Sequence, residues 1–150
     1  MGSELTWLGH GTWAIQTSKH KIILDPFLND SPTAPLKADD VDADFILVSH
    51  GHFDHVADVA SIANRCDATV VANFEIAQWF ATNHNVENTV GMNLGGSVDL
   101  PFGNAKLTLA QHSSQLPDGS YGGNPGGFLL TLDDKTVYFA CDTALFSDMM

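Results

Sequence analysis

Four metal-ligand side chains directly after an apolar segment constrain this chain more than any other feature. Residues 44–48 show no polar alternation and end in Phe-Ile-Leu-Val, which predicts a strand covered on both faces. Residues 49–55, Ser-His-Gly-His-Phe-Asp-His, then hold three histidines and an aspartate. Side chains of an extended backbone alternate, so positions 50, 52 and 54 point the same way if the chain stays extended. The sequence therefore predicts a metal site at the C-terminal end of a buried strand.

The following residues predict how the four ligands divide. Apolar residues in 56–66 recur at helical spacing, so a helix follows the motif, and the turn into it would bring His55 beside Asp54. His50 with His52, and Asp54 with His55, are then two ligand pairs, as a two-metal site needs. The alternative is a group of hydrogen-bonded histidines without an ion. Burial of four such side chains without a metal would leave several polar groups unpaired, which favours the metal site.

The composition indicates one globular domain and argues against several classes of partner. The chain has 150 residues, 44% of them hydrophobic, which is enough for one core. Its net charge is -12, from 18 acidic and 6 basic residues without a cluster of Lys or Arg, so we expect no nucleic-acid partner. No apolar run approaches the ~20 residues of a membrane span and the N-terminus lacks signal-peptide features, so we expect no membrane association and a cytoplasmic location. Cys66 and Cys141 lie far apart, which predicts a reducing compartment.

Strand and helix patterns predict a mixed α/β (α+β) fold. Strands at 5–8, 12–16 and 21–24 follow one another quickly and imply an antiparallel meander, after which 29–43 is a surface loop. Strand, helix, strand and helix alternate over 44–83, which indicates a parallel sheet. The later strands are expected at 86–90, 97–100, 105–112, 127–132 and 136–141.

Two of the late strands end in ligand-type residues. His112 closes the strand at 105–112, and Asp142 follows the strand at 136–141. Ligand sites of layered α/β sheets lie beyond the carboxyl ends of the strands, so three buried strands would bring His50, His112 and Asp142 together. We expect His112 to complete the ligand set of the first metal and Asp142 to bridge both ions. The alternative for His112 is a hydrogen-bonded core histidine. The alternative for Asp142 is the N-cap of a helix over 144–149.

Three further features point to the same edge of the molecule. His10 lies in a Gly-His-Gly turn after the first strand and would face the substrate, although a surface turn histidine is the alternative. Asp25, between Leu24 and Pro26, ends an apolar strand. It would accept the free ring N–H of a metal-bound histidine, with a simple turn residue as the alternative. The long loop 113–126 follows His112 directly, which favours a lid that faces the substrate.

The motif His-x-His-x-Asp-His at 50–55 resembles the zinc-binding signature of the metallo-β-lactamase superfamily. Five further segments resemble the branch of uncharacterised metal-dependent hydrolases related to ascorbate-6-phosphate lactonases and to the phospholipase D that acts on N-acylethanolamine lipids: 7–10, 24–26, 112–114, 123–125 and 142–143. The resemblance implies an αββα sandwich with a two-metal site at one edge, formed here by a single domain over 1–150. Members of this family continue for several more elements and supply a final histidine to the second metal. No histidine follows Asp142, so we expect an N-terminal fragment of a longer hydrolase unless His84 or a partner molecule replaces that ligand.

The resemblance also implies an activity and a ligand scheme. Two divalent ions, zinc or alternatively manganese, would hold a bridging hydroxide that attacks an ester, lactone or phosphodiester of a small-molecule substrate. The first ion would take His50, His52 and His112, the second would take Asp54 and His55, and Asp142 would bridge them. Asp54 and His10 are the candidate catalytic residues. A truncated, non-catalytic metal-binding module and a nuclease of the same fold are the alternative functions, and the natural substrate and oligomer state stay open.

Overall fold

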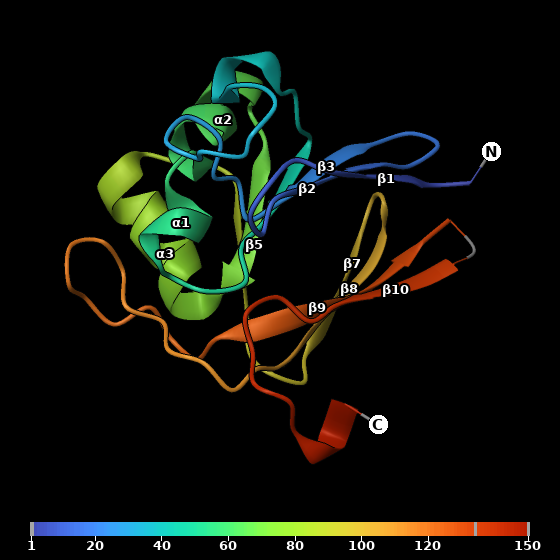
Figure 1. The fold of residues 1–150 in the computed structure, drawn as a ribbon, viewed down its shortest axis with the longest axis vertical. Helices are drawn as coiled ribbons and strands as arrows, with labels where there is room; N and C mark the ends of the chain where they lie inside the picture. Colours follow the sequence, from blue (N-terminus) through green and yellow to red (C-terminus); the bar gives the residue numbers. More distant parts are fainter. Residues whose placement is uncertain (1, 134, 150) are drawn as a thin grey trace.

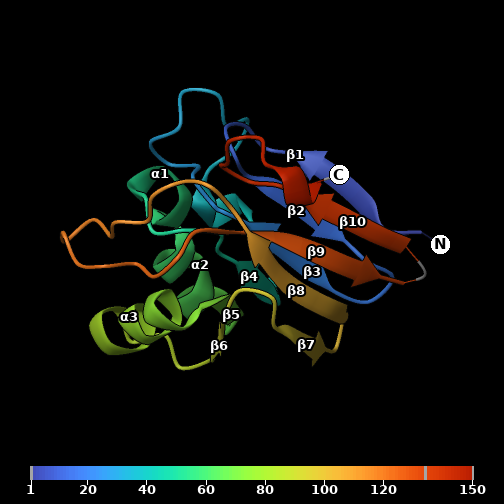
Figure 2. The same cartoon turned by 90° about the horizontal axis from the view of Figure 1, so that it is seen from below.

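Two stacked β-sheets form the centre of the molecule, and the α-helices cover the outer face of the first sheet (Figure 1). The computed structural model describes residues 2–133 and 135–149. Buried apolar side chains fill two spaces, one between the sheets and one between the first sheet and the helices. Seen from below, the second sheet lies across the first (Figure 2). The described chain therefore has the layer order α, β, β, which comprises three of the four layers of the expected αββα sandwich.

The first sheet contains six strands in sequence order. Its first three strands form the predicted antiparallel meander: β1 Glu4–Trp7, β2 Trp13–Gln16 and β3 Lys21–Leu24. The other three run parallel to β3: β4 Phe45–Leu47, β5 Thr69–Asn73 and β6 Thr89–Met92. The connections carry the 3-10 helix η1 Ala38–Asp40 and the helices α1 Phe53–Val56, α2 Val59–Cys66 and α3 Phe74–His84. No described helix has the length and apolar character needed to cross a membrane.

The second sheet is antiparallel and brings two strand ends to one edge. Its order is β10-β9-β8-β7, with β7 Ser97–Leu100, β8 Gly103–Leu109, β9 Gly126–Leu132 and β10 Lys135–Phe139. Both β8 and β10 run antiparallel to β9, so their carboxyl ends lie at the same edge. There the backbone N–H of Gly126 donates to the carbonyl of Ser49, 3.0 Å away. The ends of β4, β8 and β10 therefore meet at one rim of the two sheets.

Two predicted boundaries in the first half differ from the structure for local reasons. The expected helix over 56–66 is divided into α1 and α2, because the N–H of Asp58 donates to the carbonyl of Pro26 instead of to α1. The expected strand at 86–90 starts at Thr89, because Asn85 is left-handed and the N–H of Val86 donates to the carbonyl of Phe80. Residues 85–88 therefore close α3 before the strand begins.

The C-terminal third departs further from the predictions. The strand expected at 105–112 ends at Leu109, and the strand expected at 136–141 ends at Phe139. β10 is also an edge strand whose side chains are exposed or half-buried, so it is not the third buried strand that we expected. The helix expected over 144–149 is reduced to the 3-10 turn η2 Ser147–Met149, because the N–H of Ala144 donates to the carbonyl of Gln111.

Candidate metal centre

The histidine motif lies where β4 passes into α1. Ser49 and His50 are buried directly beyond the strand, and His52 still has extended backbone angles, φ -65° and ψ 147°. The helix α1 then begins, so its first turn carries Asp54, which we expected on the extended segment, as well as His55, which we expected at the turn into the helix. The change from strand to helix divides the motif into an upstream pair and a downstream pair of ligand-type side chains.

The upstream pair joins His112 in the first donor group. Ligand atoms of His50, His52 and His112 all lie within 4.8 Å of one another, and His50 Nε2 is 3.0 Å from His52 Nδ1. His112 follows the end of β8 by three residues instead of closing the strand, which leaves it more exposed than the buried His50. The group therefore combines two residues after the first sheet with one residue after the second sheet.

The downstream pair joins His10 in the second donor group. Ligand atoms of His10, Asp54 and His55 lie within 4.8 Å of one another. The Nε2 atom of His10 is 2.8 Å from Oδ2 of Asp54, and His10 has a left-handed backbone with φ 49°. We expected His10 to face the substrate. The structure places its ring directly against Asp54, so both a catalytic and a ligand role fit the position.

Asp142 lies between the two groups. Its Oδ2 is 3.5 Å from Nε2 of His55 and 3.7 Å from Nε2 of His112, which belong to different groups. The chain after Asp142 is not helical until Ser147, so Asp142 is not the helix N-cap that we gave as its alternative. A bridging role for this carboxylate stays a prediction.

Asp25 is buried behind the site and accepts three hydrogen bonds. Its Oδ2 accepts from Oγ of Ser49 (2.5 Å) and from Nδ1 of His55 (2.9 Å), and its Oδ1 accepts from the N–H of Ser49 (2.7 Å). Thr12 donates its hydroxyl to the carbonyl of Asp25, 2.7 Å away. Asp25 therefore lies behind a histidine of the second group, where we expected a carboxylate, and its effect on metal binding stays a prediction.

Two serines complete the contacts of the histidine rings. Ser49 Oγ is 2.9 Å from Nδ1 of His50, and Ser113 Oγ is 3.1 Å from Nε2 of His52. Neither serine was predicted as a site residue. The signal was present for both, because each hydroxyl directly precedes or follows a candidate ligand, His50 or His112.

The electrostatic environment differs between the two buried histidines. Burial lowers the pKa of His50 to about 2, and the neighbouring His55, His52 and His112 add to the effect. A neutral imidazole keeps a lone pair that can bind a metal. Burial also lowers the pKa of His55, but the hydrogen bond and charge of Asp25, followed by the charges of Asp142 and Asp54, outweigh it and raise the pKa overall.

The donor set fits divalent metal ions. Nε2 of His55 is buried and has no hydrogen-bond partner among the described residues, although it faces Asp142. A buried polar atom without a partner is costly, and a metal ion at this point would satisfy it. Imidazole nitrogens with one or two carboxylates are also the ligands that zinc and related ions take in proteins.

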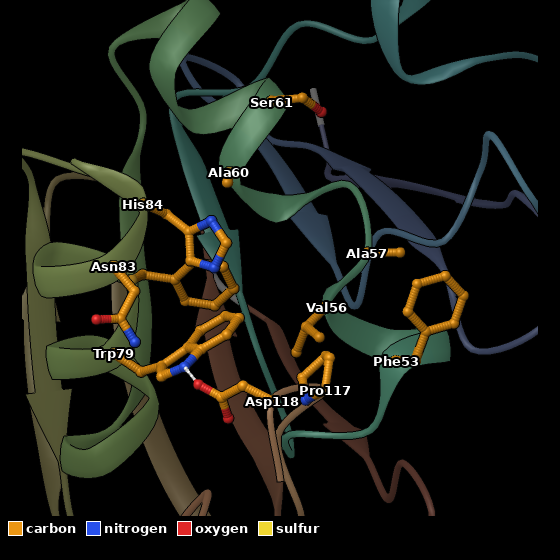
Figure 3. Close-up of a pocket in the computed structure, with 11 residues that line it drawn as sticks. Phe53, Val56, Ala57, Ala60, Ser61, Trp79, Asn83, His84, Pro117 and Asp118 are labelled. Carbon is orange, nitrogen blue, oxygen red and sulfur yellow. Dashed lines mark hydrogen bonds between the residues drawn. The ribbon is translucent and has the colours of Figure 1, made fainter. Parts of the chain in front are cut away.

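Two cavities lie close to this region. One, of about 430 Å³, is formed by His112 and the loop 113–125 and opens beside the first group. The other, of about 680 Å³, lies between α1, α2 and α3 (Figure 3). There the ring of His84 packs on Trp79 with centroids 4.2 Å apart. His84 belongs to neither donor group, so the structure does not support it as a metal ligand. The loop 113–125 is held by Asn73, whose side chain donates to the carbonyls of Gly122 and Asn124.

Relatives of known sequence share this whole region. Residues 20–150 match the family model of the beta-lactamase superfamily domain. A UPF0173 metal-dependent hydrolase of Bacillus cytotoxicus is 44% identical over 151 residues, and one of Methylacidiphilum infernorum is 40% identical over 147 residues. Each alignment covers 97% of this chain. The chain spans 65% of the length of the Methylacidiphilum relative and 66% of the Bacillus relative.

Solved structures share the fold. Igni18, a metallo hydrolase from the archaeon Ignicoccus hospitalis, superposes with a TM-score of 0.78 at 29% identity, over 97% of this chain and 63% of Igni18. CmlA, a diiron β-hydroxylase from Streptomyces venezuelae, has a TM-score of 0.75 at 16% identity, over 99% of this chain and 31% of CmlA, and shows the fold alone. The family match, the two stacked sheets and the histidine motif at their shared rim lead to one conclusion. This chain belongs to the beta-lactamase superfamily.

Proposed function

We propose that this chain forms the metal centre of a metal-dependent hydrolase. The supporting observation is the arrangement of two donor groups at one rim, with Asp142 between them. The metal-dependent hydrolases that are 40–44% identical to the chain support the same reaction class. Those proteins are longer than this chain, so we propose the hydrolase activity for the whole protein.

The residues divide into a ligand set for each ion. The first set is His50, His52 and His112, and the second is Asp54 and His55, with Asp142 shared. Bound divalent ions supply a water of lowered pKa and polarise the substrate oxygen. Zinc suits the imidazole-rich first set, and manganese is the alternative where carboxylates predominate.

His10 and Asp54 supply a proton-transfer pair at the exposed side of the second group. Their side chains are 2.8 Å apart, and both are more than a third exposed, so a substrate can reach them. Such a pair can hold a proton at Nε2 of His10 and give it to a leaving group. The buried His55 is shielded from that exchange by its hydrogen bond to Asp25.

The cavity beside His112 favours an uncharged acyl substrate. Hydroxyl and amide groups line it, from Ser113, Gln115, Ser120, Tyr121 and Asn124. In the described part of the chain, no Lys or Arg lines this cavity. Phosphate recognition normally uses such cations, which disfavours a phosphodiester. An ester or lactone with polar substituents is therefore the preferred substrate class.

A substrate panel with a metal titration tests the proposal. The purified chain is titrated with zinc and with manganese, and turnover of an aryl ester, a lactone and an aryl phosphodiester is measured. We expect two equivalents of metal and turnover of the ester or lactone. Metal binding without turnover of any compound would instead support a non-catalytic metal-binding module, the second candidate.

A further inference from the structure

We propose that Ser49 is a positioning residue that joins Asp25 to His50 and, with His52 and Ser113, forms a hydrogen-bond chain of fixed direction. This hydrogen-bond chain runs through five side chains, and three of its four hydrogen bonds are buried or half-buried. The proposal rests on the proposed function only in treating His50 and His52 as metal ligands. The direction itself follows from counting protons.

The count starts at Asp25, which can only accept. Its two carboxylate oxygens take hydrogen bonds from Ser49 N–H, Ser49 Oγ and His55 Nδ1. A serine hydroxyl has one proton, and the 2.5 Å contact to Asp25 uses it. The remaining contact of Ser49 Oγ, at 2.9 Å from His50 Nδ1, must therefore be one in which Ser49 accepts. The proton of this contact lies on Nδ1 of His50.

The direction passes through both imidazole rings. A neutral imidazole carries one proton, so Nε2 of His50 has a bare lone pair. This atom is 3.0 Å from Nδ1 of His52, which must then be the donor. Nε2 of His52 is left bare in turn, and it accepts from the hydroxyl of Ser113, 3.1 Å away. One buried carboxylate thus fixes the tautomers of His50 and His52, and also of His55.

The fixed direction has different consequences for the three rings. His50 already directs a bare Nε2 towards the first group, and His55 keeps a proton on Nδ1 against Asp25. His52 carries its proton on Nδ1, the atom that faces His50. An ion held between these two rings requires that His52 move its proton to Nε2, where Ser113 can accept it because a hydroxyl serves both as donor and as acceptor. His52 is therefore the ring of these three whose tautomer changes on metal binding.

The burial of Ser49 makes its role specific. Asp25 is 0% exposed, and Ser49 and His50 are each 1% exposed. Without the Ser49 hydroxyl, the Nδ1–H of His50 would be buried without an acceptor, which is costly. His50 would then favour a proton on Nε2. This proton would occupy the lone pair with which His50 would bind the ion.

Nuclear magnetic resonance of 15N-histidine protein tests the direction without metal. At about pH 8, above the ordinary histidine pKa, metal-free wild type should show Nδ1–H as the single ring proton of His50 and of His52. Ser49→Ala should move the His50 proton to Nε2, and Ser49→Thr, which keeps a hydroxyl, should restore Nδ1–H. The control is Thr17→Ala, which removes a buried hydroxyl at the opposite end of β2.

Zinc addition gives the second readout. In wild type, His52 should change from Nδ1–H to Nε2–H while His50 keeps Nδ1–H. Ser49→Ala should bind zinc about 10-fold to 100-fold more weakly, the usual effect of losing a partner behind a metal-bound histidine. Ser49→Thr and Thr17→Ala should keep the affinity.

Two results would overturn the inference. An Nε2–H signal for His50 in metal-free wild type contradicts the direction of the chain even if no variant folds. An unchanged His50 tautomer together with unchanged zinc affinity in folded Ser49→Ala contradicts the role of Ser49. The tautomers of metal-free wild type are measured independently of zinc, so failure to bind zinc at all would refute the proposed function, whereas the predicted tautomers would still support the hydrogen-bond chain.

Discussion

Asp25 has a backbone conformation that its sequence neighbours do not favour. Its φ is 46°, in the left-handed region, and Pro26 follows it directly. Non-glycine residues in this region are strained, and a following proline restricts them further. Three hydrogen bonds to the carboxylate and one from Thr12 to the carbonyl offset that strain. The strained turn is what brings the carboxylate to the back of His55.

Replacement of Asp25 by Asn tests this contact. The amide group of Asp25→Asn can accept from His55 or from Ser49, but it cannot accept all three hydrogen bonds, because its nitrogen is a donor. We expect zinc affinity to fall about 10-fold to 100-fold while circular dichroism shows the fold retained. Asp44→Asn, at the exposed start of β4, is the control. If affinity is unchanged and only the melting temperature falls, Asp25 is a turn residue.

Replacement of His10 separates its two roles. If His10 holds a proton against Asp54, His10→Ala should lower turnover by about 100-fold or more, the usual contribution of a general acid, and the zinc content should stay intact. Zinc content is measured by mass spectrometry of metals, and turnover is measured with the best ester or lactone of the panel. His20→Ala, in the hairpin between β2 and β3, is the control. Loss of one equivalent of zinc would identify His10 as a ligand.

At the scale of elements, one hydrogen bond fastens the loop 113–125 to α3. Nε1 of Trp79 donates to Oδ2 of Asp118, 2.6 Å away, and both residues line the cavity between α1, α2 and α3 (Figure 3). The hydroxyl of Ser120, and then Trp79, lower the pKa of Asp118 to about 2, so the carboxylate is charged at neutral pH. Hydrogen bonds to charged acceptors are stronger than neutral ones. The loop beside His112 is therefore held at both its base and its tip.

Trp79→Phe removes this hydrogen bond and keeps an aromatic ring against His84. We expect the amides of 118–120 to exchange with solvent faster by up to about tenfold, the factor that corresponds to the net contribution of one hydrogen bond. The amides of β9 should keep their exchange rates. Hydrogen exchange followed by mass spectrometry measures both regions. Equal rates at 118–120 in the variant and in wild type would show that Trp79 does not hold the loop.

The sequence predicted the elements that depend on local pattern and missed those that depend on distant contacts. The apolar run before His50 predicted β4, because a strand buried on both faces has that composition. The strand expected at 86–90 exists but begins only at Thr89, since the end of α3 depends on the contact of Val86 with Phe80. The helix expected over 144–149 was wrong for the same kind of reason, because a contact with Gln111 competes with it.

The candidate site shows the same division. The motif at 50–55 is contiguous, so its clustering could be predicted from spacing. The positions of His112 and Asp142 required the order of the second sheet. The contact of His10 with Asp54 requires the turn after β1 to approach α1, and the direction of the Ser49 hydroxyl requires coordinates. The contact of His10 with Asp54 has no signature in the sequence, whereas Ser49 is visible there as the neighbour of His50 and only the direction of its hydrogen bond is not.

On the scale of the whole molecule, a metal ion in the first donor group would join the two sheets. His50 and His52 follow β4 of the first sheet, and His112 follows β8 of the second sheet. Among the described residues, one backbone hydrogen bond links the two sheets at this rim, from the N–H of Gly126 to the carbonyl of Ser49. An ion held by the three rings would therefore act as a cross-link between sheets that otherwise meet mainly through apolar packing.

Zinc should consequently raise the melting temperature of the chain. A ligand that binds the folded state at 100 times its dissociation constant stabilises it by about 2.7 kcal/mol, which corresponds to about 5–10 °C for a chain of this size. Differential scanning calorimetry with zinc and with a chelator measures the shift. In His112→Ala the first group keeps only ligands from the first sheet, so most of the shift should be lost. His84→Ala, a histidine outside both donor groups, should keep it. An equal shift in His112→Ala and wild type would show that zinc binds without joining the two sheets.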